Sequence, residues 1–189
     1  LHPRVRRQRQ MCIRDRSETK QFIESIITNI INIISNDNNE ARDFAVLASS
    51  TKLLRNIDIL YRQRTNEQTE ITFISNETLE RLKQIHQVTD EKAANWKFNR
   101  DFEALERTRK QLFTTDKRCL KISTIQSFKG WESPSVIVIL ENDIVLHNTT
   151  FRPMSPQTIY TAITRARENM YIINIGNDTY HNFFYNQTL

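Results

Sequence analysis

The chain has 189 residues, enough for one domain of ordinary size with its own core. Hydrophobic residues make up 38% and charged residues 26%, which is typical of a globular protein and excludes an intrinsically disordered one. The longest apolar stretch, residues 23–34, is interrupted by polar side chains, so no membrane-spanning helix is predicted. Two cysteines without metal-type spacing fit free thiols, and we expect a cytoplasmic protein.

The net charge of +5 comes from the N-terminus. Residues 1–17 contain six arginines and one aspartate, which leaves 27 − 6 = 21 basic and 22 − 1 = 21 acidic side chains elsewhere. This basic tail resembles translated sequencing-adapter or cloning sequence, and the alternative is an arm that binds nucleic acid. We treat residues 1–17 as a non-native or disordered tail and residues 18–189 as the folded domain.

Behind the tail, apolar residues recur at three- and four-residue intervals, which predicts an amphipathic helix with Ser17 as its N-cap. Short apolar runs then alternate with helical patterns. We expect strands at 44–49, 70–75, 120–124, 135–140 and 170–175, and helices at 51–63, 76–88, 101–113 and 155–168. Asn76 and Ser155 are the predicted N-caps of two of these helices, and residues 89–101 and 141–154 read as irregular. Strands that alternate with helices predict an α/β fold with a mainly parallel sheet covered on both faces.

Several kinds of site are excluded by spacing. The two glycines, Gly130 and Gly176, are too far apart for a phosphate-binding loop or a dinucleotide-binding loop. The four histidines show no metal-ligand spacing, so no metal site is predicted. If this chain handles nucleotides, another surface must supply the phosphate loop.

The stretch "TIQSFKGWE", residues 124–132, follows a predicted strand, so it should lie at the carboxyl edge of the sheet, where ligands bind. Gly130 permits a positive φ, and Glu132 can accept hydrogen bonds from a pair of ribose hydroxyls. The alternative is an ordinary crossover in which Lys129 and Glu132 are solvated.

The stretch "YTAITRARE", residues 160–168, carries Arg165 and Arg167 on a predicted helix, where they would point about 200° apart. One guanidinium could then project from the domain toward a phosphate. The alternative is two solvated arginines, one of them paired with Glu168. We interpret Tyr160 and Ile163 as packing residues.

In combination, "STIQSFKGWESPSVIVIL" (123–140) and "IYTAITRARENMYIINIG" (159–176) resemble the C-terminal motor domain of UvrD/Rep-like superfamily 1 helicases. The chain looks most similar to helicases that follow a nuclease-related domain. The resemblance covers about residues 18–185, and "FAVLAS" (44–49) matches the strand that opens this second RecA-like domain. It implies a three-layer RecA-like domain of the P-loop NTPase fold that lacks its own phosphate loop.

The resemblance implies three residues on the nucleotide side. Arg165 matches the arginine finger that reaches the γ-phosphate of ATP. Glu132 matches the glutamate that binds the ribose, and Gly130 the glycine near the γ-phosphate. ATP and its Mg²⁺ would be held by an N-terminal RecA-like domain of the same protein.

Four further positions match the side that faces nucleic acid. Thr124, Gln126 and Ser127 match residues that contact the backbone of single-stranded DNA or RNA, and Lys129 either contacts nucleic acid or braces the turn. Gln126 stands where the family commonly has histidine.

Two other positions depart from the residues that the family commonly has. Ser49 stands where the family often has an arginine that touches the γ-phosphate, and Arg55 lies too far along to replace it. Trp131 replaces the usual leucine and is interpreted as a core residue.

The sequence therefore predicts the C-terminal motor domain of an ATP-dependent helicase or translocase, inactive as an ATPase by itself. One alternative is an ATP-binding regulatory or nuclease-associated module that translocates without unwinding. Another is a non-enzymatic interaction or nucleic-acid-binding domain that keeps only the fold.

Overall fold

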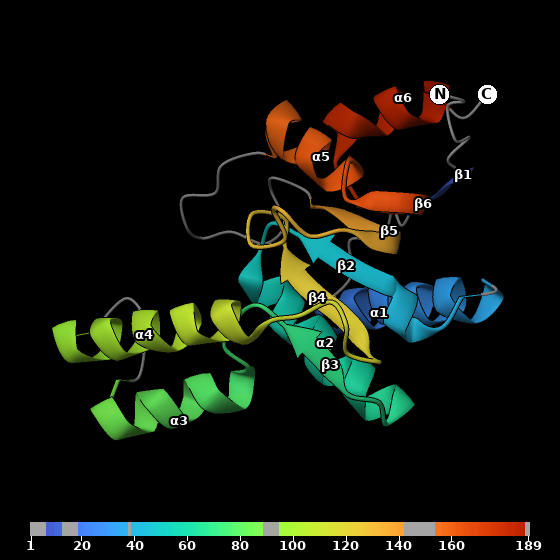
Figure 1. Cartoon of the computed structure of the whole chain (residues 1–189). Helices are drawn as coiled ribbons and strands as arrows, with labels where there is room; N and C mark the ends of the chain where they lie inside the picture. The colour runs from blue at the N-terminus through green and yellow to red at the C-terminus, as the bar shows by residue number, and fades with distance from the viewer. Residues whose placement is uncertain (1–6, 13–18, 38, 89–94, 142–153, 188–189) are drawn as a thin grey trace.

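A computed structural model of the chain describes residues 7–12, 19–37, 39–88, 95–141 and 154–187. Within them, six strands form one sheet in the order β1-β6-β5-β2-β4-β3, and all neighbouring strands are parallel (Figure 1). The predicted α/β fold with a parallel sheet is confirmed. The strands are β1 (Arg7–Cys12), β2 (Phe44–Ala48), β3 (Thr69–Ile71), β4 (Leu120–Thr124), β5 (Ser133–Glu141) and β6 (Ala166–Ile175).

Helices cover both faces of this sheet and form the outer layers, with α1 (Thr19–Asn36) and α2 (Thr51–Thr65) on one face and α5 (Pro156–Ile163) and α6 (Asp178–Gln187) on the other. Two further helices, α3 (Asn76–His86) and α4 (Trp96–Leu112), pack in a separate cluster, and a short 3-10 turn spans Ala41–Asp43. Alternate residues of β2 separate the two cores. Phe44 and Val46 pack with α1 and α2, whereas Ala45 and Leu47 pack with α5 and α6. This alternation is the two-residue period of a strand that is buried on both faces.

Helices α3 and α4 form a separate pair, which we call the arm. The arm projects from the β3 side of the sheet (Figure 1) and has a small core of its own. That core contains Ile74, Leu79, Leu82, Val88 and Phe98, with Phe102 and Leu105 packed against it.

The N-terminal segment contributes strand β1, which pairs in parallel with β6 from Arg7↔Asn169 to Cys12↔Asn174. The sheet therefore has one strand more than the five predicted, since residues 1–17 were set aside from the fold. The boundary between residues 17 and 18 stays a prediction, and Ser17 itself lies outside the described residues.

Helix starts follow local capping. Ser155 Oγ accepts from the Thr158 backbone N–H at 3.2 Å with Pro156 as the first helical residue, as predicted. Helix α4 begins at Trp96 rather than residue 101, because Asn95 Oδ1 accepts from the Phe98 N–H at 2.9 Å. Ser75, not Asn76, caps α3.

Strand lengths differ from the predictions where tertiary contacts intervene. Strand β3 ends at Ile71 rather than residue 75, and β5 continues to Glu141 instead of ending at residue 140. Helix α5 ends at Ile163 rather than residue 168. Strand β6 then begins at Ala166 because it pairs with Ser133 of β5.

No helix in the described part of the chain is both long and apolar enough to cross a membrane.

Candidate functional site

The turn of residues 125–130 carries the chain from one edge of the sheet to the other. Thr124 is paired with Ala48 at the end of β2, whereas Ser135 is paired with Phe44 at its start. The prediction that the whole stretch 124–132 stays at the carboxyl edge is therefore wrong. Since β4 and β5 are parallel, the chain must return along the sheet before β5 begins, so Glu132 lies at the amino edge.

Side chains and backbone bonds hold this turn in place. Thr124 Oγ1 accepts from the Ser127 N–H at 3.2 Å and donates to Ser127 Oγ at 2.9 Å. Ile125 and Phe128 are fully buried in the core beneath the turn. Gln126 and Lys129 are exposed. The turn thus presents an amide and an ammonium to solvent from a fixed backbone.

Aromatic packing connects this turn to the root of the arm. The buried Phe113, which follows α4, makes edge-to-face contacts with Phe128 and Trp131, with ring centroids 6.0 and 5.6 Å apart. Trp131 was interpreted as a core residue, but it is only half-buried and packs against the outside of the core.

Position 130 requires glycine because of its backbone φ angle, and not because a side chain would lack space. Its φ is +93°, and a Cβ at this position would meet no heavy atom within 4 Å. A side chain here would be strained by the left-handed conformation alone.

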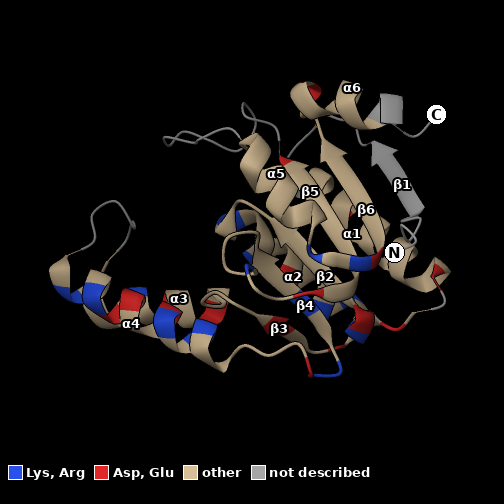
Figure 2. Cartoon of the chain, turned by 45° about the horizontal axis from the view of Figure 1, so that its top comes forward, with Lys and Arg blue, Asp and Glu red and all other residues tan. Residues whose placement is uncertain are grey.

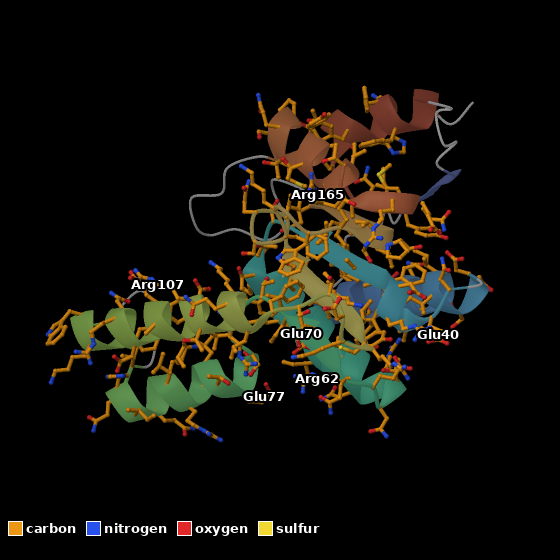
Figure 3. The ribbon with its side chains drawn as sticks, viewed as in Figure 1. Glu40, Arg62, Glu70, Glu77, Arg107 and Arg165 are labelled. Carbon is orange, nitrogen blue, oxygen red and sulfur yellow. The ribbon has the colours of Figure 1, made fainter. Side chains whose placement is uncertain are left out.

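Arg165 is the residue that brings the two sequence stretches together. Its backbone carbonyl accepts from the Ser133 N–H at 3.0 Å. Its guanidinium donates to the Thr161 carbonyl at 3.1 Å, the Trp131 carbonyl at 3.3 Å and Thr164 Oγ1 at 3.0 Å. Both stretches therefore meet at Arg165, which Figure 3 labels, and Glu132 lies between two residues bonded to it.

The guanidinium keeps donor capacity. Of the five N–H groups of an arginine, these three bonds use one on Nε, one on Nη1 and one on Nη2. One N–H on each terminal nitrogen has no acceptor among the described residues. These two N–H groups are available to donate to phosphate oxygens.

Glu132 is more weakly held. Its carboxylate lies 3.6 Å from Arg167 Nε, and both side chains are more than half exposed. An ion pair of this kind contributes little to stability, so a ligand could displace it readily.

The predicted helical positions of the two arginines are wrong. Arg165 lies in the connection after α5, and Arg167 is the second residue of β6. Tyr160 is 70% exposed, so it is not a packing residue, because the inner face of α5 is formed by Ile159 and Ala162. Ile163 packs against the core as predicted.

A buried carboxylate at the carboxyl edge was missed by sequence reasoning. Glu141 Oε1 accepts from the backbone N–H groups of Ser49 and Ser50, at 2.6 and 2.7 Å, where α2 begins. Burial raises the pKa of Glu141, and these two bonds partly oppose the rise. Its Oε2 has no partner among the described residues. The available signal was a charged residue at the end of a long apolar run.

Arg55, the nearest arginine to Ser49 on α2, is buried and donates from Nε to the Ile74 carbonyl at 2.9 Å. This contact joins α2 to the start of the arm, which is a structural role. In the described part of the chain, no three His, Cys, Asp or Glu side chains gather as a metal site.

Residues 35–174 match the viral superfamily 1 RNA helicase core domain. The chain belongs to this helicase family. The matched region contains the turn of residues 125–130 as well as Arg165 and Glu132. The prediction of a superfamily 1 helicase is confirmed at this level, whereas the narrower resemblance to UvrD/Rep-like helicases stays a prediction.

A comparison with curated proteins finds no match. Among solved structures, this helicase domain is similar to the C-terminal domain of a possible DNA helicase from Lactobacillus plantarum WCFS1. The two share 14% identity with a TM-score of 0.45, over 88% of this chain and 73% of the other.

Proposed function

We propose that this chain is the second RecA-like motor domain of an ATP-dependent helicase or translocase of the UvrD/Rep type. It acts on single-stranded DNA or RNA together with a first RecA-like domain that carries the phosphate loop. The observation that carries the proposal is the Arg165 guanidinium, anchored by three bonds beside Glu132 and keeping two N–H groups for a ligand.

On the nucleotide side, ATP with Mg²⁺ held by the first domain supplies the phosphoryl group that is transferred to water. Arg165 donates its two remaining N–H groups to γ-phosphate oxygens and stabilises the charge that develops there. Because its other donors are already bonded, little rearrangement of the side chain is needed. Glu132 accepts from the ribose hydroxyls, and Gly130 lets the backbone turn near the phosphate.

On the nucleic-acid side, Gln126 and Lys129 are the exposed residues of the turn and donate to backbone phosphates. Ser127 can add a hydroxyl contact. Thr124 acts mainly through the turn, since its hydroxyl is bonded to Ser127. The same rigid turn thus joins the nucleic-acid contacts to Glu132, which couples closure of the two domains to movement along the strand.

A second candidate is a regulatory or non-enzymatic module that binds nucleic acid without ATP turnover. Ser49 favours it, because this position lacks the arginine common in the family and its amide is bonded to Glu141.

The test joins this chain to a first RecA-like domain with a phosphate loop and measures ATP turnover with single-stranded DNA and RNA. Arg165→Ala should lower turnover by about 10³-fold. Arg165→Lys should recover little, because an ammonium cannot form the two-pronged contact. Arg107→Ala is the matched control, since Arg107 lies on α4 with a 78% exposed side chain (Figure 3) and should leave turnover unchanged.

Equal turnover in Arg165→Ala and the parent protein would refute the finger. A joined protein that binds single strands but never turns over ATP would support the second candidate.

A further inference from the structure

The outer end of the arm exposes a large aromatic side chain. Trp96 is the first residue of α4 and is 67% exposed. The arm's core is formed by other residues, with Phe98 as its aromatic member on the same helix turn. An exposed tryptophan adds little to the stability of the arm, but it offers a wide, flat surface for stacking.

Two cations lie against this ring. Lys97 Nζ is 5.8 Å and Arg100 Cζ 5.5 Å from the Trp96 ring centroid. Lys97 makes no ion pair with a carboxylate among the described residues. Arg100 also pairs with Asp101 at 2.9 Å, and Asp101 is bonded in turn to His86 at 3.1 Å. Trp96, Lys97 and Arg100 form what we call the tip patch.

The position of Lys97, in the first turn of α4, is unfavourable for the helix itself. The first turn of α4 has no acidic residue, although a helix N-terminus is stabilised by negative charge and destabilised by positive charge. Figure 2 shows basic segments at the outer end of the arm, ahead of the mixed charges along its length. Among the described residues at this end of the arm, Lys97 and Arg100 outnumber the one nearby carboxylate, Asp101, so the tip patch suits an anionic ligand.

We propose that the tip patch binds single-stranded nucleic acid. An unpaired base stacks on Trp96, and Lys97 and Arg100 bond to the flanking phosphates. An exposed ring with adjacent cations complements both parts of a nucleotide, the flat base and the charged phosphate. A purely apolar patch would complement the base alone. The substrate class rests on the proposed function, but the binding can be measured without ATP.

The distance along the arm makes this a second contact, separate from the turn. Helix α4 has 17 residues, so it is about 25 Å long. Its inner end is fixed to the turn through Phe113, which packs on Phe128 and Trp131. A strand held at Gln126 and Lys129 would meet Trp96 several nucleotides further along.

The experiment titrates the 189-residue chain into fluorescently labelled oligo(dT) and oligo(U) of ~20 nucleotides, a length that exceeds the usual site sizes. Trp96→Ala should weaken binding by about 5- to 100-fold, and Trp96→Phe should keep most of the affinity because it keeps a stacking face. Lys97→Gln should lower the slope of log affinity against log salt by about 0.7, the value for one phosphate contact on a single strand.

Arg107→Gln is the matched control: it removes one positive charge from the middle of α4 and should leave affinity and slope close to those of the parent chain. Far-ultraviolet circular dichroism of every variant checks that the helices remain. Trp96→Ala and Lys97→Gln binding like the parent chain would overturn the proposal, and so would a parent chain that binds neither oligonucleotide.

A variant of the turn shows whether the tip patch and the proposed motor function stand or fall separately. If Lys129→Gln weakens binding while Trp96→Ala does not, the nucleic-acid side of the motor stands and the tip patch falls. If Trp96→Ala weakens binding but the joined protein shows no ATP turnover, the tip patch stands and the motor function falls.

Discussion

The sheet and the arm are stabilised by hydrophobic cores of very different size. The sheet is covered on both faces, and its two cores contain most of the buried side chains among the described residues. The arm relies on one cluster with five buried residues. A region with so few buried contacts opens locally at a lower free energy than the sheet. The difference indicates that the arm can unfold or bind while the sheet stays intact.

The two candidate binding residues, one near the sheet and one on the arm, differ in the same way. Arg165 is held by three hydrogen bonds and lies where the two motif stretches meet. Trp96 has neighbouring cations but no packing partner in the arm's core. The first suits a charge that must be placed before reaction, and the second suits a surface that adapts to different bases.

The largest expected effect comes from making the same change in both regions. Phe44 in β2 is 0% exposed and Phe98 in α4 is 2% exposed. Phe44→Ala should lower the global free energy of unfolding by about 3–5 kcal/mol, because a cavity forms in the main core. Phe98→Ala should instead accelerate hydrogen exchange in α3 and α4, with a smaller shift of the urea midpoint.

Urea unfolding and hydrogen exchange on both variants would measure this contrast. Equal midpoint shifts, with exchange increased across the sheet in both variants, would show that arm and sheet unfold as one unit.

A medium effect concerns Glu141 and pH. Its raised pKa means that the folded state binds this proton more tightly than the unfolded state. The free energy of unfolding should therefore fall as pH rises from about 4.3, the ordinary glutamate pKa, through the raised value. The slope from one proton is at most about 1.4 kcal/mol per pH unit. Glu141→Gln should remove this component in urea unfolding measured across pH.

Glu77→Gln at the arm would serve as the comparison, because a backbone hydrogen bond and, to a smaller extent, Arg62 lower the pKa of Glu77. A pH profile unchanged by Glu141→Gln would contradict the link to the buried carboxylate.

The smallest effect is expected at the junction of the two regions. Arg62 of α2 lies 2.8 Å from the buried Asp58 and 3.0 Å from Glu77 of α3 (Figure 3). Glu77→Gln leaves the Asp58 pair intact and should weaken the arm by less than about 1 kcal/mol, since the carboxylate is exposed. Hydrogen exchange in α3 at low and high salt measures it. Glu80→Gln, which removes only the pair with Lys83 inside α3, is the control. A large global destabilisation by Glu77→Gln would contradict a separable arm.

The alternation of strands and helices was predicted from local patterns alone, and it implied the parallel sheet, because parallel neighbours need crossover connections that bury both faces of the sheet. Capping residues such as Ser155 marked a helix start through a contact only three residues away. The two motif stretches could also be recognised from the sequence, because each lies at the boundary of a strand or helix that the local apolar pattern predicts.

Where those stretches meet depends on contacts between distant parts of the chain. Pairing of Ser133 with Ala166 extended β6 and took Arg165 and Arg167 off the predicted helix. The parallel direction of β5 moved Glu132 to the amino edge, and the amides of Ser49 and Ser50 allowed a buried strand to end on Glu141. Each of these depends on partners more than 30 residues away, and periodicity along the chain carries no information about such partners.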